Sequence, residues 1–267
     1  MQEMPPAMIL CGGQGTRLRE VTELLPKPMV PIGEQPVLWH IMKCYAAFGV
    51  RRFILCLGYK RESFVDYFTN YRLRTTDATV IPGKREKTVF HSRSPEDEWE
   101  ITLAGTGLHS GTGTRVRLAS RYLKEKDSSF FLTYGDGLAD IDIGAELAFH
   151  ESHSKLLTVG AVHPAARFGE MKIGKDNLVR SFVEKPSRVS GYINGGFMVV
   201  RREFVPRFIP EEDCFFEQAP LNDAAAAGEM CAFRHEGFWQ CMDTPREHAM
   251  LNKLWESGEA PWTKYWK

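Results

Sequence analysis

The sequence of 267 residues predicts an α/β fold built on a largely parallel central sheet. Short apolar runs alternate with amphipathic stretches along the first half of the chain, which is typical of parallel strands joined by crossover helices. Glycines at positions 12, 13, 135 and 137 follow two of these runs, as expected where buried strands end in turns. A chain of this length is also able to bury a large core.

Each element of the first half follows from its own pattern of apolar residues. Three short, continuous apolar runs predict buried strands at 7–11, 53–57 and 130–134. Between and after them, apolar residues at helical spacing mark one face of a helix. The expected helices span 37–48, 62–68 and 143–152.

The second half changes to short strands separated by turns rich in glycine, proline and asparagine. The expected strands are 156–162, 171–173, 179–183 and 197–200, with a hairpin connection at 174–177. They predict a strand-rich region laid beside or against the α/β part. We therefore expect one domain, 1–267, with approximate sub-regions 1–155 and 156–267.

Two further segments have a distinct character. Residues 82–98 are polar and crowded with charges, which predicts a mobile loop or flap. Residues 244–255 have a helical pattern, and Trp262 and Trp266 after them imply that the C-terminal end packs against the rest of the protein.

Charge and composition exclude several classes of function. Lys plus Arg and Asp plus Glu both number 34, so the formal net charge is zero, which argues against nucleic-acid and polybasic membrane-surface binding. No apolar run reaches about 18 residues, and the N-terminus lacks a signal-peptide pattern. The six cysteines are scattered without a Cys-x-x-Cys pair, which favours buried thiols in a reducing compartment. We therefore expect a cytoplasmic protein.

The most informative segment runs from Leu10 to Leu18 and reads Leu-Cys-Gly-Gly-Gln-Gly-Thr-Arg-Leu. Its glycines, directly after a strand, let the backbone approach a ligand, and successive amides form a nest for an anion. A dinucleotide fingerprint needs glycine where Leu18 stands, and a P-loop needs the Gly-Lys-Ser/Thr that is missing here. An ordinary strand-to-helix turn stays open as the alternative.

Two basic residues accompany this turn. Arg17 follows the glycines, and Lys27 comes ten residues later in a proline-rich loop that fixes its position. An arginine and a lysine that converge on phosphates are what phosphoryl transfer requires, because there the protein mainly positions groups and neutralises charge.

Two aspartates are candidate metal ligands. Asp136 lies in a Gly-Asp-Gly sequence at the carboxyl end of an apolar strand, the edge at which α/β sheets bind ligands. Asp243 ends the apolar run from Phe238. A plain turn is the alternative for Asp136, and a helix N-cap is the alternative for Asp243. Together they are able to supply the carboxylates that hold Mg²⁺ beside substrate phosphates.

Other conspicuous residues favour structural roles. His150 and His153 have a spacing that a metal ion could use on a helix, but without a third ligand nearby a surface pair is the better interpretation. Trp39 and Trp239 are interpreted as core residues, because aromatic burial alone explains them.

Taken together, these residues resemble the sugar nucleotidyltransferase family. The likeness rests on Gly-Gly-x-Gly-Thr-Arg-Leu at 12–18, Lys-Pro at 27–28 and Gly-Asp-Gly at 135–137. It extends along nearly the whole chain, through Glu-Lys-Pro at 184–186 and Asn-Gly-Gly at 194–196. The stretches Trp-His-Ile-Met at 39–42 and Phe-Trp-Gln-Cys-Met-Asp-Thr at 238–244 are similar to the cytidylyl branch.

The resemblance implies a Rossmann-like, mixed and mostly parallel central sheet flanked by helices, with a smaller strand-rich C-terminal part that binds the sugar. It implies an enzyme that joins CTP to a hexose 1-phosphate and releases pyrophosphate, uses Mg²⁺ and forms a homo-oligomer. Arg17 and Lys27 would be catalytic, and Asp136 and Asp243 would bind the metal. The nucleotide would contact Leu10, Cys11, Gly12, Gly13, Gln14, Gly15, Thr16, Ser110, Arg115 and Gly135. The sugar phosphate would contact Glu184, Lys185, Asn194 and Gly195.

The chain departs from the family pattern at several places, among them Cys11, which replaces an alanine of nearly the same size. Thr114 replaces a glycine before Arg115, and Leu25 and Gln35 replace frequent lysines, which removes two positive charges. Use of another nucleotide or hexose phosphate therefore stays open. One alternative is a non-catalytic subunit of the same fold that binds a nucleotide or a sugar, but the retained Arg17, Lys27 and aspartates disfavour it. Another alternative is a nicotinamide-dependent oxidoreductase, which Leu18 disfavours.

Overall fold

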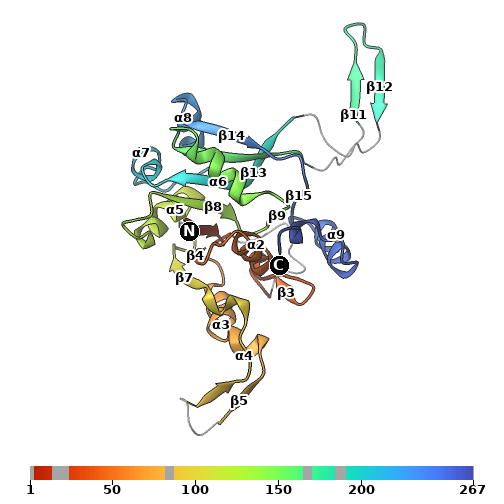
Figure 1. Ribbon diagram of the computed structural model, residues 1–267. Coiled ribbons are helices and arrows are strands. Elements are labelled where there is room, and N and C mark those ends of the chain that lie inside the picture. The colour runs from red at the N-terminus through yellow and green to blue at the C-terminus, as the bar shows by residue number, and fades with distance from the viewer. Residues whose placement is uncertain (1–2, 14–23, 82–86, 165–169, 184–190, 267) are drawn as a thin grey trace.

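The fold is organised around one mixed sheet. The computed structural model describes residues 3–13, 24–81, 87–164, 170–183 and 191–266, and Figure 1 shows the arrangement of its elements. Within these residues the central sheet has seven strands in the order β14-β10-β13-β8-β1-β4-β7. Neighbouring strands are parallel except at β13, which runs antiparallel to β8 and β10. The predicted α/β fold with a mixed, mostly parallel sheet is confirmed.

The strands of this sheet come from both halves of the chain. In chain order they are β1 (Ala7–Leu10), β4 (Arg52–Leu57), β7 (Glu100–Gly105), β8 (Ser129–Tyr134), β10 (Leu157–Val162), β13 (Ile193–Arg201) and β14 (Met230–Arg234). Thus β10, β13 and β14 extend the same sheet that β1 begins, instead of forming a separate layer beside it. Sequence patterns missed β7 and β14 at the two sheet edges, whose residues are partly buried or exposed except for the buried Ala104.

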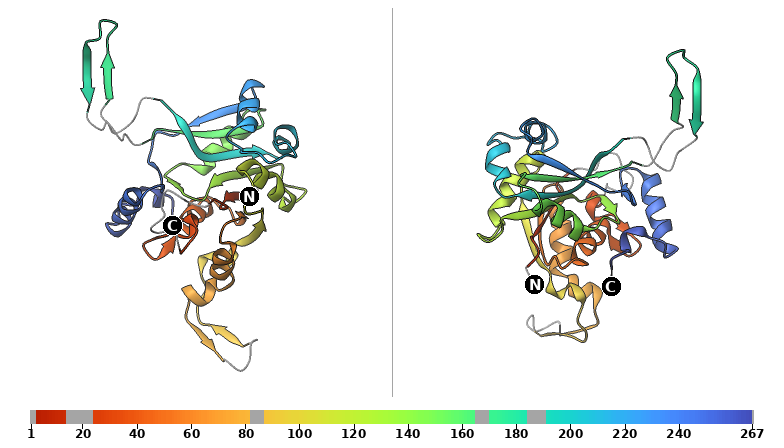
Figure 2. Two further views of the ribbon diagram at one scale, coloured as in Figure 1. Left: turned by 180° about the vertical axis from the view of Figure 1, so that it is seen from behind. Right: turned by 45° about the horizontal axis from the view of Figure 1, so that its top comes forward.

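Helices cover both faces of the sheet, as Figure 2 shows from two sides. Alternate residues of β1 explain this, because Ala7 and Ile9 belong to one buried cluster and Met8 and Leu10 to the other. The first cluster includes residues of α2 (Val37–Ala46), α3 (Arg61–Thr69), α6 (Ile143–Glu151) and α9 (Pro245–Glu256). The second includes residues of α5 (Thr112–Ala119), α7 (Phe204–Phe208) and α8 (Ala219–Ala226).

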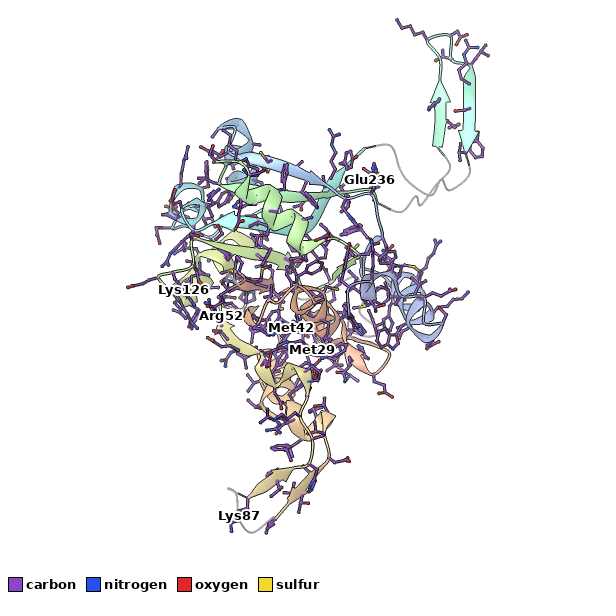
Figure 3. The ribbon with its side chains drawn as sticks, viewed as in Figure 1. Met29, Met42, Arg52, Lys87, Lys126 and Glu236 are labelled. Carbon is purple, nitrogen blue, oxygen red and sulfur yellow. The ribbon has the colours of Figure 1, made fainter. Side chains whose placement is uncertain are left out.

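The C-terminal end packs into the first cluster, as the tryptophans predict. Trp262 in the short 3₁₀ helix η5 (Pro261–Thr263) is almost fully buried and lies near the rings of His40 and Phe238. Trp266 packs edge-on against Trp39. Met29 and Met42, which are labelled in Figure 3, belong to the same buried cluster.

Two antiparallel ribbons project from the body (Figures 1 and 2). One pairs β11 (Glu170–Ile173) with β12 (Val179–Val183), and its turn at 174–177 confirms the predicted hairpin. The other pairs β5 (Ala78–Val80) with β6 (Thr88–Phe90), with Lys87 at its tip in Figure 3.

The prediction of a mobile loop or flap over 82–98 is wrong for residues 95–98, which form a capped helix held to the body. Beyond β6, a 3₁₀ helix, η3 (Pro95–Glu98), is capped by Ser94. Its Glu96 accepts a hydrogen bond from Lys43 of α2 at 2.9 Å, so an ion pair between residues distant in sequence holds the segment to the body. Asp97 and Glu98 of the same 3₁₀ helix also pair with Arg72 and Arg51.

The remaining short elements surround the carboxyl edge of the sheet or connect larger ones. They are η2 (Lys27–Met29), β2 (Pro31–Ile32), β3 (Gln35–Pro36), α4 (Tyr71–Thr75), η4 (Ser120–Tyr122), β9 (Gly137–Ala139) and β15 (Trp239–Cys241). Among the described residues, no helix is both long and apolar enough to cross a membrane.

Candidate active site

A cavity of about 270 Å³ lies at the carboxyl ends of the parallel strands. Its walls come from the turn after β1, the turn after β8, the 3₁₀ helix η2, the start of α5 and one residue before α8. The lining residues are Leu10, Cys11, Gly12, Gly13, Lys27, Pro28, Ser110, Thr112, Arg115, Tyr134, Gly135, Asp136 and Phe215. The structure thus brings together the described members of the predicted nucleotide set. Gln14, Gly15, Thr16 and Arg17 lie outside the described residues.

Lys27 joins the two predicted metal ligands. Its Nζ donates to Asp136 Oδ2 at 2.5 Å and also to Asp243 Oδ1. Burial opposes protonation of Lys27, but the Asp136 and Asp243 carboxylates outweigh it and raise the pKa of the lysine. The group is therefore an ammonium ion held between two carboxylates.

Strand pairing explains why residues so distant in sequence meet here. The strand β15 pairs antiparallel with β9, so that Cys241 lies opposite Gly137. The Met242 amide then donates to the Asp136 carbonyl at 2.9 Å, which sets Asp243 beside Asp136. The plain-turn interpretation of Asp136 leaves this convergence unexplained.

The N-cap interpretation of Asp243 is wrong. Helix α9 is capped by Thr244, whose hydroxyl accepts from the Glu247 amide in a capping box. The Glu247 carboxylate in turn accepts from the Asp243 and Thr244 amides at 2.8 and 2.9 Å. The Asp243 carboxylate does not cap the helix and contacts Lys27. The Thr-x-x-Glu spacing is a signal in the sequence that identifies Thr244 as the cap.

Cys241 is a neighbour of this pair that sequence reasoning missed. Its Sγ lies 3.5 Å from Asp243 Oδ2. Burial, reinforced by the charges of Asp243 and Asp136, raises the pKa of Cys241 to about 12. The thiol is therefore neutral and donates to the aspartate.

Arg115 holds the cavity wall together. The residue is 4% exposed, and its guanidinium donates to Thr106 Oγ1 at 2.9 Å and to the Gly107 carbonyl at 2.7 Å. It also reaches the carbonyls of Gly12 at 3.3 Å and Leu57 at 3.4 Å. One buried cation thus ties the ends of β1, β4 and β7. A Cβ atom at position 12 would collide with this guanidinium, which explains the glycine there.

The segment 213–217, which sequence reasoning also missed, covers the start of α5. The Cys214 carbonyl accepts from the Gly113 amide at 3.0 Å, and Asp213 Oδ1 accepts from the Gly111 amide at 2.8 Å. The hydroxyl of Thr114, which replaces a glycine of the family pattern, accepts a hydrogen bond from the Cys214 amide at 3.0 Å. The first amides of this helix are therefore bound by protein groups.

The same segment reaches across the cavity. Glu217 accepts from the Tyr134 hydroxyl at 2.5 Å and from the Thr112 hydroxyl at 2.6 Å. Next to it, Phe215 lines the cavity with a side chain that is 51% exposed. Glu217 therefore links two lining residues, Tyr134 and Thr112, and Phe215 adds an aromatic side chain to the lining.

The predicted sugar-binding residues of β13 lie at the same edge. Because β13 runs antiparallel to β8, its amino end meets the carboxyl ends of the other strands. Trp239 donates to the Gly195 carbonyl at 2.7 Å, and Asn194 Oδ1 accepts from the Gly196 amide at 2.8 Å. Glu184 and Lys185 lie outside the described residues.

The structure also tests predictions for residues outside the cavity. His150 is fully buried, so the surface-pair interpretation is wrong for it. His150 and His153 both contact the Thr158 hydroxyl at 2.9 Å, which gives the two imidazoles a structural partner. Trp39 and Trp239 are partly buried against the core.

Leu25 and Gln35, which replace two lysines frequent in the family, both contact other parts of the protein. Leu25 packs against the core, and Gln35 accepts from Tyr67 at 2.6 Å.

The two carboxylates at Lys27 are candidate ligands of a divalent cation. Among the described residues, no group of three or more His, Cys, Asp or Glu side chains is arranged to hold a metal ion. Two carboxylates from different elements nevertheless contact one cationic nitrogen. This set fits Mg²⁺, which commonly takes one or two protein carboxylates and completes its shell with water and substrate phosphates.

Comparison with known proteins agrees with this geometry. Residues 6–207 match the model of the nucleotidyl transferase family. The chain belongs to the nucleotidyl transferase family. It is 46% identical to glucose-1-phosphate cytidylyltransferase of Salmonella typhimurium, over 98% of this chain and 99% of that protein. It is 38% identical to the probable glucose-1-phosphate cytidylyltransferase of Bacillus subtilis, over 97% and 99% of the two chains.

A solved structure supports the same placement. The crystal structure of HddC from Yersinia pseudotuberculosis superposes with a TM-score of 0.64 and 25% identity, covering 94% of this chain and all of that one. The predicted sugar nucleotidyltransferase resemblance is confirmed, and the chain is a nucleotidyltransferase. The nicotinamide-dependent alternative is excluded by this membership.

Proposed function

We propose that this nucleotidyltransferase joins CTP to α-D-glucose 1-phosphate and forms CDP-glucose and pyrophosphate. The observation that carries the proposal is the 46% identity to the Salmonella glucose-1-phosphate cytidylyltransferase over nearly the full length of both chains. The product would serve as a precursor for deoxysugar or polysaccharide synthesis in the cytoplasm.

The reaction needs no covalent enzyme intermediate. A phosphate oxygen of glucose 1-phosphate attacks the α-phosphorus of CTP, a new P–O bond forms, and the bond to the β-phosphate breaks as pyrophosphate leaves. The turn after β1, with Gly12 and Gly13, lines the cavity and is suited to cradle the nucleotide with backbone amides. The chemistry then depends on position and charge, as in other phosphoryl transfers.

Positively charged groups and the residues that bind the sugar phosphate have the remaining roles. Arg17 and Lys27 are proposed to neutralise the charge that grows on the leaving pyrophosphate. Asp136 and Asp243 would hold Mg²⁺, which screens the phosphates when bound. Glu184, Lys185, Asn194 and Gly195 are proposed to bind glucose 1-phosphate. Gly195 lies near the start of β9, one residue after Asp136, which supports this role. A Cβ atom built on Gly137 would be 4.0 Å from the Gly195 carbonyl oxygen.

The test is a matrix of nucleoside triphosphates against sugar 1-phosphates, read by pyrophosphate release. We expect the highest kcat/KM for CTP with glucose 1-phosphate. A clear preference for UTP or dTTP would overturn the cytidylyl assignment and leave the family unchanged. Silence in every well, from protein with a native circular dichroism spectrum, would favour a non-catalytic binding subunit.

We also propose that the chain forms a homo-oligomer and that residues 156–267 form the sugar-binding sub-region. The projecting ribbon β11–β12 supports assembly, because Met171 and Phe182 pair across it with more than half of each side chain exposed. Sedimentation equilibrium measures the state directly. A monomer at micromolar concentration would contradict this part of the proposal.

A further inference from the structure

Lys27 occupies the place between two carboxylates that a divalent cation would take. We propose that its ammonium group is an internal counter-ion, which keeps free Mg²⁺ out of the Asp136–Asp243 pair until a triphosphate draws the lysine away. Metal entry then depends on the nucleotide. The inference rests on the proposed function, because it requires a triphosphate in the cavity.

Lys27, Asp136 and Asp243 are in direct contact through their charged groups. Lys27 Nζ is 2.5 Å from Asp136 Oδ2 and also contacts Asp243 Oδ1. Because both oxygens contact the same nitrogen, they lie close enough together to share one ion. The Lys27 side chain is 12% exposed, against 29% and 25% for the side chains of Asp136 and Asp243, so all three are partly buried.

Charge makes the two cations competitors. Removal of the Lys27 ammonium takes one positive charge away from the Asp136 and Asp243 carboxylates and so strengthens their attraction for a metal ion. Mg²⁺ and Lys27 are unable to occupy the same few ångströms together, since their repulsion in a partly buried site is strong. Without another partner for Lys27, metal binding must break both of its ion pairs.

A triphosphate offers the partner that frees the aspartates. Lys27 lines the same cavity as Gly12 and Gly13, so its side chain needs only to turn from the carboxylates toward phosphates beside those glycines. The flanking Pro26 and Pro28 restrict the backbone, whereas the four-carbon side chain keeps its rotations. By linkage, metal and nucleotide each raise the affinity for the other.

The test measures Mn²⁺ binding to the free protein, without nucleotide, by calorimetry and by the loss of the free-ion EPR signal. We expect Lys27→Gln to bind Mn²⁺ at least tenfold more tightly than the wild type. Lys124→Gln, which removes a lysine that pairs with Glu100 away from the cavity, should match the wild type. Adding Asp136→Asn to Lys27→Gln should abolish the gain.

Two results would overturn the inference. One is a Lys27→Gln protein, native by circular dichroism, whose Mn²⁺ affinity equals or falls below that of the wild type. The other is tight, low-micromolar Mn²⁺ binding by the wild type alone, which needs no variant to fold. Lys27→Met provides a second variant of similar length without a charge.

This experiment is separate from the test of the proposed function. Mn²⁺ binding to free protein requires neither CTP nor glucose 1-phosphate, so a different nucleotide preference leaves its result unchanged. Pyrophosphate release by the wild type in the substrate matrix measures the function by itself. The two proposals are therefore able to fail independently.

Discussion

Replacement of Arg115 by alanine would remove the buried guanidinium that ties three strand ends beside the cavity. Its two shortest hydrogen bonds are 2.7 Å to the Gly107 carbonyl and 2.9 Å to Thr106 Oγ1. Hydrogen bonds to a charged group contribute about 1.5–3 kcal/mol each, and the cost of burying the guanidinium offsets part of that sum. We expect Arg115→Ala to lower the free energy of unfolding by about 3 kcal/mol.

The assay is denaturant and thermal unfolding followed by tryptophan fluorescence. For a chain of this size the loss corresponds to a fall in Tm of roughly 6–10 °C. The matched control is Arg117→Ala on the same helix, whose guanidinium pairs with the exposed Glu211 and should contribute less than about 1 kcal/mol.

The outcome separates two roles for Arg115. As the tie between strand ends, its loss lowers stability and also weakens nucleotide binding, because the walls of the cavity move. If Arg115→Ala kept wild-type stability and only raised KM for the nucleotide, the reasoning from its protein contacts would be refuted. The residue would then act as a direct nucleotide ligand.

Three further changes have distinct expected outcomes. Trp239→Phe removes the donor to the Gly195 carbonyl and should raise KM for the sugar phosphate by about fivefold at an unchanged nucleotide KM, since one hydrogen bond contributes about 1 kcal/mol; steady-state kinetics decide. Glu217→Gln replaces a charged acceptor of two hydroxyls and should cost about 1–2 kcal/mol in urea unfolding, so an unchanged midpoint would contradict the network. Burial raises the pKa of Glu146 from 4.5 to about 8, so the folded protein binds this proton more tightly and stability falls as pH rises between these values. Glu146→Gln should flatten that slope and add about 2–4 kcal/mol at pH 8, and an unaltered pH profile would refute it.

Sequence patterns were sufficient for the elements whose residues are buried in short apolar runs. The runs at 7–11, 53–57 and 130–134 became β1, β4 and β8, the buried centre of the sheet. Local patterns succeed there because a strand buried on both faces must be apolar throughout. They failed at β7 and β14, because an edge strand is buried on fewer sides and its residues carry a weaker signal.

Residue types and spacing alone identified the nucleotidyltransferase signature, the candidate residues around the glycine-rich turn and the two aspartates. The contacts of those residues became known from the folded structure. Lys27 meets Asp136 and Asp243 across separations of 109 and 216 residues, and Arg115 turns its charge to backbone carbonyls. The physical reason is that residue type fixes charge and hydrogen-bonding capacity locally, whereas partners are chosen by strand order and pairing, which bring distant segments to one sheet edge.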